Sequence, residues 1–301
     1  MRETLSERIE AARRELAALR PGDWEASVRE ESPEGGVVVE YRSGADRVVG
    51  KLRADRAHGR DAPGSGEAAF RLLASLAERE TPTLRVPRPI LWCAGPRALL
   101  TEAAAGEPCR GLDPARAADT LERIGRALRE LHELPAPPGP PRRLADHVAE
   151  LIRPSPEALA SALPAHAGRI SGTLERLRTA EAAWGELPVA TLHRDFHMRQ
   201  LFDDGRRITV VDWDDAASGD PAFDVGFFTA YLRTHFDARV AQAGISAFCA
   251  GYGAGGGIRE RVAVYEQFNY LRRACRRFRL RDAGWEVEMT AMLARLDQGR
   301  A

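Results

Sequence analysis

The sequence predicts an α+β protein in which a small antiparallel β-sheet region with one helix precedes a large, mostly helical region. Three observations lead to this prediction. Short runs of β-branched and aromatic residues, separated by turn residues, fill the first third of the chain. Apolar residues recur at helical spacing through most of the remainder. A length of 301 residues also exceeds what one small core needs and suits two packed lobes.

The first third of the chain predicts the elements of a small sheet. Apolar residues at helical spacing predict a helix over residues 4–19, which Pro21-Gly22 ends. Residues 36–42 and 47–53 predict two paired strands, because the turn residues 43–46 lie between them. The same reasoning predicts a helix at 67–79 and further strands at 24–29, 86–92 and 97–102.

The pattern changes after Gly106. Residues 114–133 predict a long amphipathic helix, and the proline-rich residues 135–141 predict a stiff linker. Residues 188–226 predict loops with two short β runs, at 200–202 and 208–211. The remaining helices are predicted at 143–153, 155–163, 166–183 and 222–298. We therefore divide the chain into an N-lobe, residues 1–104, and a C-lobe, residues 105–301.

Composition excludes several classes of protein. Lys plus Arg and Asp plus Glu both number 44, so no general field attracts nucleic acid or an anionic membrane. The charged N-terminus lacks the apolar core of a signal peptide, and no apolar run approaches the ~18 residues of a membrane span. The four Cys residues form no C-x-x-C pair and fit a reducing compartment. We expect a cytoplasmic protein without membrane or nucleic-acid partners.

Residues 191–226 contain the acidic residues with the clearest chemical meaning. Asp195 and Asp212 flank a predicted β-hairpin whose turn is Asp203-Asp204-Gly205. Because a hairpin brings its ends together, we expect the two carboxylates to converge. Phosphoryl transfer needs a group that accepts the hydroxyl proton and oxygen ligands that hold Mg²⁺ beside the phosphates. Two converging carboxylates therefore favour this chemistry.

The same stretch carries a family resemblance. Residues 193–200, His-Arg-Asp-Phe-His-Met-Arg-Gln, resemble the H-R-D-x-x-x-x-N catalytic loop of kinases, and residues 211–214, Val-Asp-Trp-Asp, resemble the metal-binding segment that follows it. With Gly219-Asp220-Pro221 and Asp224, the stretch resembles the aminoglycoside phosphotransferase family, which pairs an H-G-D-x-H loop with a D-W-x segment and a G-D-P-x-x-D tail. The resemblance implies a bilobal protein-kinase-like fold. It covers roughly residues 20–280, and residues 191–224 are its specific part.

The resemblance implies roles for the matched residues. Asp195 would be the catalytic base, Gln200 and Asp212 would bind Mg²⁺, and His193 and Asp224 would brace the loop.

Other loop residues leave alternatives open or depart from the family pattern. His197 either contacts the γ-phosphate or has a buried structural role. Arg199 either supplies charge to the transition state or is an ordinary loop arginine. Three residues depart from the family pattern, with Arg194 at the usual Gly, Met198 at the common Pro and Gln200 at the usual Asn.

The N-lobe supplies candidate nucleotide contacts. Lys51 lies in the third β run, where kinases place a lysine against the α- and β-phosphates, and Glu67 in the following helix would pair with it. Residues 99–106 resemble an inter-lobe hinge, in which backbone groups from Glu102 to Ala104 would bind the edge of an adenine or guanine. Either ATP or GTP fits these features.

Two glycine-rich segments have different interpretations. Residues 31–36, between the first two β runs, are the candidate phosphate loop, although they do not match G-x-G-x-x-G. Residues 251–256 contain several glycines but follow a helix, so we interpret them as a helix–helix connection.

A basic segment, residues 271–281, is either a solvated helix face with ion pairs or a recognition site for an anion or nucleic acid. Late helices build the acceptor pocket in this type of phosphotransferase, so Tyr270 and Arg276 are acceptor candidates. The carboxylates of Asp214, Asp215 and Asp220 either attract a cationic acceptor or cap the next helix.

We predict a phosphotransferase that moves the γ-phosphate of ATP or GTP, with Mg²⁺, to a hydroxyl of a small molecule such as an aminoglycoside or other antibiotic, a sugar or an amino alcohol. The short segment after Asp212, without an A-P-E motif, argues against a protein acceptor. The alternatives are an atypical protein kinase, suggested by Arg194, a non-catalytic nucleotide-binding module, suggested by Gln200, and a nucleic-acid binder. The acceptor and the oligomeric state are left open.

Overall fold

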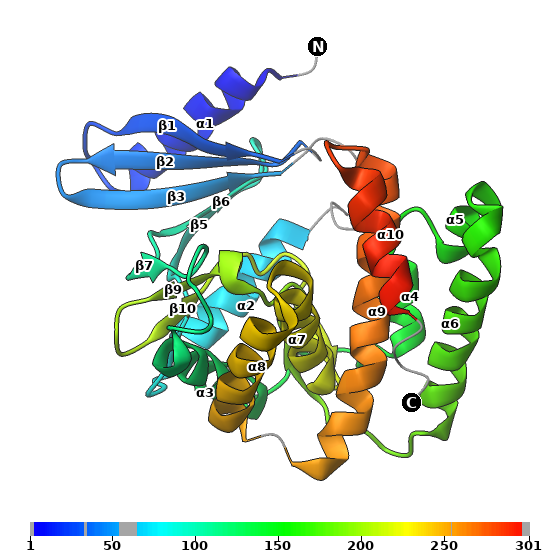
Figure 1. The fold of residues 1–301 in the computed structure, drawn as a ribbon. Coiled ribbons are helices and arrows are strands. Elements are labelled where there is room, and N and C mark those ends of the chain that lie inside the picture. The colour runs from blue at the N-terminus through cyan, green and yellow to red at the C-terminus, as the bar shows by residue number, and fades with distance from the viewer. Residues whose placement is uncertain (1–2, 33–34, 54–64, 254, 297–301) are drawn as a thin grey trace. The chain divides into compact units, whose positions relative to one another are not determined.

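The structure of the protein, a computed structural model, describes residues 3–32, 35–53, 65–253 and 255–296 (Figure 1). The chain forms two compact units. Unit 1 consists of residues 1–107 together with 201–214, and unit 2 consists of residues 108–200 and 215–301. The short segment 201–214 therefore belongs with residues that precede it by about a hundred positions in the sequence.

Unit 1 is built on an antiparallel sheet. Within the described residues its strand order is β1-β2-β3-β6-β5 (Figure 1). Val39 and Tyr41 alternate with polar residues along β2, and they are fully buried in one core with Ala12 and Leu16 of α1. The elements are α1 (Leu5–Leu19), β1 (Glu25–Glu31), β2 (Val37–Ser43), β3 (Asp46–Leu52), α2 (Ser65–Ala77), β5 (Pro89–Cys93) and β6 (Ala98–Glu102). Each matches a predicted element to within a few residues.

The predicted hairpin also forms, in unit 1. Its strands are β9 (Leu201–Asp203) and β10 (Ile208–Val210), and its turn residue Gly205 has a positive φ of 84°. A second sheet has the order β4-β10-β9-β7, in which β10 pairs in parallel with β4. The sequence analysis missed β4 (Leu84–Arg85) and β7 (Glu107–Pro108), because two-residue strands carry no periodic pattern.

Gly106 follows β6 where the backbone passes this hairpin. Its φ is 98°, and a Cβ atom there would lie 2.5 Å from the carbonyl carbon of Asp203. The same segment is held by Thr209, whose hydroxyl donates to Ala105 O at 3.1 Å. The hairpin is thus attached to the end of the strand that the sequence analysis interpreted as the hinge.

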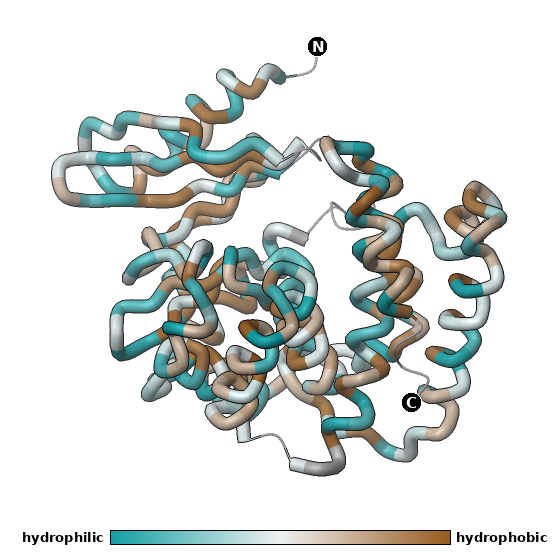
Figure 2. Tube along the Cα trace, viewed as in Figure 1, coloured by the Kyte–Doolittle hydropathy of each residue, from teal (hydrophilic) through white to brown (hydrophobic). Residues whose placement is uncertain are grey.

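Unit 2 is mostly helical. Its helices are α3 (Ala118–Glu133), α4 (Leu144–Leu151), α5 (Pro156–Ala162), α6 (Pro164–Ala183), α7 (Ala222–His235), α8 (Ala238–Tyr252), α9 (Gly256–Leu280) and α10 (Trp285–Arg295). Strands β8 (Ala190–Leu192) and β11 (Ala217–Gly219) form a small antiparallel pair, and η2 (Met198–Gln200) is a 3₁₀ turn. Figure 2 shows apolar and polar residues alternating along α9 and α10, as expected for helices with one buried side.

Two predicted helix boundaries can be compared with the structure. The helix predicted from residue 114 begins four residues later, because Asp113 forms a turn in which its side chain and its carbonyl accept from the N–H groups of Ala115 and Arg116. The glycine-rich segment 251–256 is a helix–helix connection, as predicted, since Gly253 ends α8 with φ = 71° and α9 begins at Gly256. Residue 254 lies outside the described residues.

Helices α3 and α8 approach each other through glycines. A Cβ atom on Gly125 would lie 2.1 Å from Phe248 O, and one on Gly251 would lie 1.9 Å from Glu122 O. Only the absence of side chains allows this backbone contact. The helix pair that carries His132 at the end of α3 is therefore fixed at close range.

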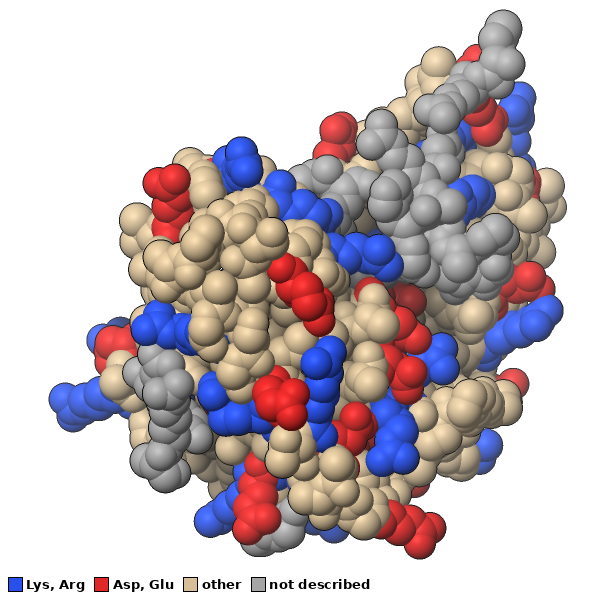
Figure 3. All heavy atoms as spheres, turned by 90° about the vertical axis from the view of Figure 1, so that its right-hand side faces the viewer, with Lys and Arg blue, Asp and Glu red and all other residues tan. Residues whose placement is uncertain are grey.

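The fold class is the predicted α+β, with an antiparallel sheet in the N-terminal part and a mostly helical remainder. None of the helices in the described part of the chain is both long and apolar enough to cross a lipid bilayer. On the face drawn in Figure 3, Lys and Arg side chains are interspersed with Asp and Glu side chains, which matches their equal totals.

Candidate functional site

The first part of the candidate site is the segment 193–200, termed here the HRD loop, which lies in unit 2. Asp224, in the first turn of α7, is fully buried and forms hydrogen bonds with the backbone of the HRD loop. The Asp224 carboxylate accepts the backbone N–H groups of His193 at 2.7 Å and Arg194 at 2.8 Å. His132 contacts the same carboxylate through Nε2 at 3.3 Å. These contacts form the brace that the sequence implied for Asp224.

Arg194 adopts the left-handed conformation, with φ = 66°. Glycine reaches this region without strain, which explains the usual Gly at this position in the resembled family. The Arg194 side chain is buried and donates to Glu150 Oε2 at 2.6 Å and to Asp215 O at 3.3 Å. It is an internal support for the loop, a role that the sequence analysis missed.

Asp195 directly follows the two braced residues, and 21% of its side chain is exposed. Its Oδ1 accepts a hydrogen bond from Nη2 of Arg272 on α9 at 3.2 Å. Its Oδ2 lies 3.5 Å from Nε2 of His197, and its backbone N–H donates to Nδ1 of His193 at 3.3 Å. The carboxylate therefore has a cationic group on one side and an imidazole on the other.

His197 packs on an aromatic surface of α7. Its ring stacks on Tyr231 with centroids 5.3 Å apart and on Phe227 at 6.0 Å. Arg199 is exposed, and its backbone N–H donates to His197 Nδ1 at 3.2 Å. Gln200 is half-buried at the end of η2, and its N–H donates to His197 O at 2.9 Å. Unit 2 thus brings Asp195 and His197 together and keeps Arg199 and Gln200 on the same loop.

The second part of the candidate site is in unit 1. Lys51 Nζ on β3 forms ion pairs with Asp212 Oδ1 and with Asp214 Oδ2, the latter at 2.8 Å. Asp214 also pairs with Arg53. Burial opposes the charge of Lys51, but the two carboxylates outweigh it and raise the pKa of the amine. Asp212 has a positive φ of 68°, a strained conformation of the kind found at functional sites.

The described residues do not form the predicted ion pair between Lys51 and Glu67. Glu67 makes its ion pair with Arg71, one turn further along α2, at the exposed surface. The reason is local: residues four apart on a helix face each other, whereas the Lys51 amine is drawn to two carboxylates at the end of the hairpin.

Two of the backbone N–H groups in the predicted hinge form hydrogen bonds within unit 1. The N–H of Glu102 donates to Arg88 O at 2.9 Å, and the N–H of Ala103 donates to Arg47 O at 3.3 Å. Both donors therefore serve the sheet. The Glu102 carboxylate lies at the surface, 3.8 Å from Arg20. Ala104 follows directly and is half-buried. Of the candidate phosphate loop, residues 33–34 lie outside the described residues.

The oxygen atoms near Lys51 determine whether the site could hold Mg²⁺. In the described part of the chain, no group of three or more His, Cys, Asp or Glu side chains could hold a metal by itself. Mg²⁺ keeps several waters and binds phosphates, so it needs only one or two protein oxygens. The Asp212 carboxylate, which lies against the Lys51 amine at the end of the hairpin, supplies oxygens of this kind. The residues therefore fit the ion.

Comparison with known proteins places the chain in a family. The model of the phosphotransferase enzyme family matches residues 38–258. The chain belongs to this family. No curated protein sequence matches this phosphotransferase.

Solved structures agree on the fold. This phosphotransferase is similar to a choline/ethanolamine kinase family protein from Mesorhizobium loti, with 21% identity and a TM-score of 0.62 over 97% of this chain and 94% of that one. It is similar to an aminoglycoside-3'-phosphotransferase of type VIII, with 21% identity and a TM-score of 0.59 over 86% and 97%. It is also similar to a spectinomycin phosphotransferase, with 13% identity and a TM-score of 0.63 over 100% and 94%. The predicted protein-kinase-like fold is confirmed.

The arginines of the basic segment 271–281 of this phosphotransferase differ in burial and in partners. Arg272 is buried against Asp195, whereas Arg277 pairs with Asp282 and Glu288 at the surface, and Arg276 is exposed. Sequence analysis left a solvated face and a recognition site open for this segment, and it missed the contact of Arg272 with Asp195. The burial of this part of α9 had a sequence signal, because Leu271, Ala274 and Cys275 surround Arg272, but its partner Asp195 had none.

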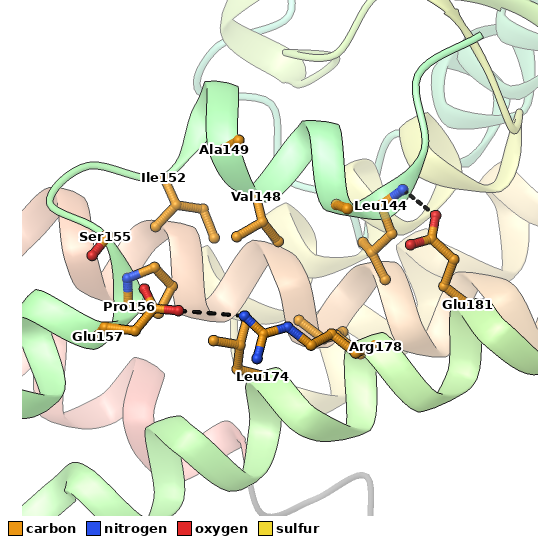
Figure 4. Close-up of a pocket in the computed structure, with 12 residues that line it drawn as sticks. Leu144, Val148, Ala149, Ile152, Ser155, Pro156, Glu157, Leu174, Arg178 and Glu181 are labelled. Carbon is orange, nitrogen blue, oxygen red and sulfur yellow. Dashed lines mark hydrogen bonds and ion pairs between the residues drawn. The ribbon is translucent and has the colours of Figure 1, made fainter.

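Unit 2 of this phosphotransferase contains a hollow of about 310 Å³ between α4, α5 and α6 (Figure 4). Figure 4 shows apolar side chains such as Val148, Ile152 and Leu174 around it, with the ion pair of Glu157 and Arg178 at its edge. Its described lining includes no residue predicted for the site. We therefore leave it outside the candidate site.

Proposed function

We propose that this chain is a small-molecule kinase that transfers the γ-phosphate of ATP or GTP, held with Mg²⁺, to a hydroxyl group, with Asp195 as the base. The observation that carries the proposal is the position of Asp195. Its carboxylate is partly exposed on a loop that a buried aspartate, Asp224, holds through two backbone hydrogen bonds. A general base must be fixed in this way and still be reachable by the acceptor.

The transfer step uses this carboxylate directly. The acceptor oxygen attacks the γ-phosphorus, the bond from phosphorus to the β–γ bridging oxygen breaks, and the nucleoside diphosphate leaves with that electron pair. The hydroxyl proton passes to Asp195. His197 and Arg199 on the same loop are proposed to lie beside the transferred group, where cationic or hydrogen-bonding side chains stabilise its charge.

Unit 1 is proposed to hold the nucleotide. Lys51 would contact the α- and β-phosphates, and Asp212 with Gln200 of unit 2 would bind Mg²⁺, which neutralises phosphate charge when bound. Glu67 and Glu102 stay predicted nucleotide contacts; in the structure Glu67 pairs with Arg71, and the Glu102 N–H donates within the sheet. The N–H of Ala104 is the better candidate for the base edge.

The acceptor class follows from the family and from what related structures contain. A spectinomycin phosphotransferase of the same fold was solved in complex with ADP and spectinomycin. Choline and ethanolamine kinases share the fold as well. We propose an acceptor among hydroxylated antibiotics, sugars and amino alcohols, and ATP or GTP as the donor. A cytoplasmic location remains a prediction.

The proposal is tested by measuring nucleoside diphosphate release with Mg²⁺ and either ATP or GTP, across a panel of these acceptors. Asp195→Asn should lower kcat on the best acceptor by about 10²–10⁴-fold, the usual contribution of a general base. Asp46→Asn, at an exposed hairpin turn of unit 1, is the matched control and should retain wild-type turnover.

Two results would contradict the proposal. One is acceptor-stimulated turnover that survives Asp195→Asn, which would remove the base from Asp195. The other is an absence of both turnover and nucleotide-dependent thermal stabilisation, which would show that Asp195 and Asp212 form no working site. Nucleotide-dependent stabilisation without turnover would favour the non-catalytic nucleotide-binding module. Phosphorylation of a peptide but of no small molecule would assign the fold to a protein kinase.

A further inference from the structure

Arg272 is a buried cation placed against the proposed base. It lies on α9 in unit 2, is 7% exposed, and its guanidinium carbon lies 4.9 Å from the centroid of the Phe227 ring on α7. Its Nη2 donates to Asp195 Oδ1 at 3.2 Å. Burying a guanidinium is costly unless an opposite charge compensates it, so the position of Arg272 depends on a carboxylate being there.

The opposite side of the same carboxylate is occupied by His197, whose Nε2 lies 3.5 Å from Asp195 Oδ2. Phe227 and Tyr231 are four residues apart and share one face of α7. The His197 ring stacks on both, and the Arg272 guanidinium lies over Phe227. One aromatic face thus supports both groups that contact the base.

We propose that Arg272 is a positioning residue for Asp195. It fixes the orientation of the carboxylate and keeps it ionised until the acceptor hydroxyl gives up its proton. The inference rests on the proposed function, because it assigns Arg272 a role only if Asp195 is the base. Arg272 itself acts through Asp195 and is given no contact with the acceptor or the phosphate.

Other ionisable groups on the HRD loop and on nearby helices form the background for removal of Arg272. On the HRD loop these groups are His193, Arg194, His197 and Arg199; on α7, Asp224, Tyr231 and His235; on α9, Arg273; on α4, His147 and Glu150, which pairs with Arg194. Asp224 is occupied by backbone N–H groups. Loss of the Arg272 charge leaves Asp195 easier to protonate, because a nearby guanidinium stabilises the ionised form.

The test compares three variants with wild type on its best acceptor. Arg272→Gln removes the charge, Arg272→Lys keeps a charge but loses the planar fork, and Arg273→Gln is the matched control. Arg273 is the next residue on α9, and its guanidinium contacts His235 Nε2 at 3.2 Å. Measured quantities are kcat, both KM values and the pH profile of kcat/KM from about pH 5 to about pH 9, together with the thermal midpoint.

We expect Arg272→Gln to lower kcat about 10–100-fold near neutral pH, the size of effect that a misplaced catalytic group produces. The acid limb of its kcat/KM profile should move upward by about one pH unit or more, since an opposite charge at this range shifts a carboxyl group by that amount. The KM for nucleotide should stay unchanged. Arg272→Lys should recover the wild-type acid limb with part of kcat, and Arg273→Gln should match wild type.

Each other outcome has a definite meaning. An unmoved acid limb in a folded, active Arg272→Gln, or a limb displaced equally in Arg272→Lys, would overturn the positioning role. A raised acceptor KM with unchanged kcat would instead place Arg272 in acceptor binding and also overturn it. If Arg272→Gln does not fold, Arg272→Lys decides by kcat: a kcat below wild type with an unmoved acid limb is expected, and a wild-type kcat would overturn the positioning role. Failure of the proposed function is distinct: wild type would then show no turnover with any acceptor, and both inferences would be rejected.

Discussion

Arg194, whose backbone has a positive φ of 66°, donates from its guanidinium to Glu150 Oε2 at 2.6 Å. Arg194 therefore adopts a backbone conformation that favours glycine, while its side chain forms an ion pair with Glu150. Replacing it by Gly or by Ala removes the same contacts, so the two variants differ in backbone strain. We expect Arg194→Gly to be more stable than Arg194→Ala by about 1 kcal/mol, measured by urea unfolding. Equal stability would show that the backbone relaxes.

The two carboxylates that share Lys51 are expected to differ in function. Asp214 forms ion pairs with both Lys51 and Arg53, so two cations compensate its charge. Asp212 is the predicted metal ligand. Asp212→Asn should lower kcat/KM by about 100-fold or more and raise the Mg²⁺ concentration for half-maximal activity. Asp214→Asn should have a smaller effect and leave the Mg²⁺ dependence unchanged. Reversed magnitudes in a Mg²⁺ titration would exchange the two assignments.

His147 on α4 is expected to make the protein acid-sensitive. It is fully buried, and neither ring nitrogen has a hydrogen-bond partner among the described residues. Burial, and then the charges of Arg194, Arg142 and Arg272, lower its pKa well below 6.5. The unfolded chain therefore binds a proton below about pH 6.5 that the folded protein does not, and stability falls as the pH decreases, by up to ~1.4 kcal/mol per pH unit.

Replacing this residue gives the test. His147→Leu should reduce the slope of the unfolding free energy against pH below about pH 6.5, and His235, whose pKa burial lowers to about 4, should keep part of that slope. The half-buried His166 supplies the control, because His166→Gln should retain the wild-type slope. A His147→Leu protein that loses stability with acid as steeply as wild type would assign the slope to other groups.

The close contact of α3 and α8 predicts that an alanine at Gly251 lowers the stability of the protein, whereas an alanine at an open helical glycine raises it. Gly251→Ala would place Cβ 1.9 Å from Glu122 O, so the helices must separate, at a cost of about 1–3 kcal/mol or more. Gly168 in α6 has nothing within 4 Å of its Cβ position. Gly168→Ala should therefore stabilise by roughly 0.5–1 kcal/mol. Chemical denaturation of both variants decides, and a neutral Gly251→Ala would contradict the packing described here.

Most elements of the fold were predictable because their signals are local. Alternation in β2 and β3, the turn at Gly205 and the end of α8 at Gly253 are all encoded within a few residues. The parallel pairing of β4 with β10 was not predictable, because it joins Leu84 to Ile208 and neither strand is long enough to show a period.

The residues of the candidate site also fall into those with a local sequence signal and those without one. Asp195 and Asp212 were found from a contiguous stretch of sequence. Arg272, by contrast, lies 77 residues from Asp195, and His132 lies 92 residues from Asp224. Such partners are selected by the three-dimensional packing of α3, α7 and α9, which no spacing rule in the sequence encodes. The convergence of Asp195 with Asp212 stays a prediction.

The segment 201–214 has a consequence for synthesis. Strand β10 completes a sheet of unit 1 whose partner β4 was translated more than a hundred residues earlier. At ~5–20 residues per second, a ribosome takes roughly 6–25 s to cover that interval. During this time the early part of the protein carries an unfilled strand position, so a nascent chain released before residue 210 exposes a sheet edge to chaperones and to other chains.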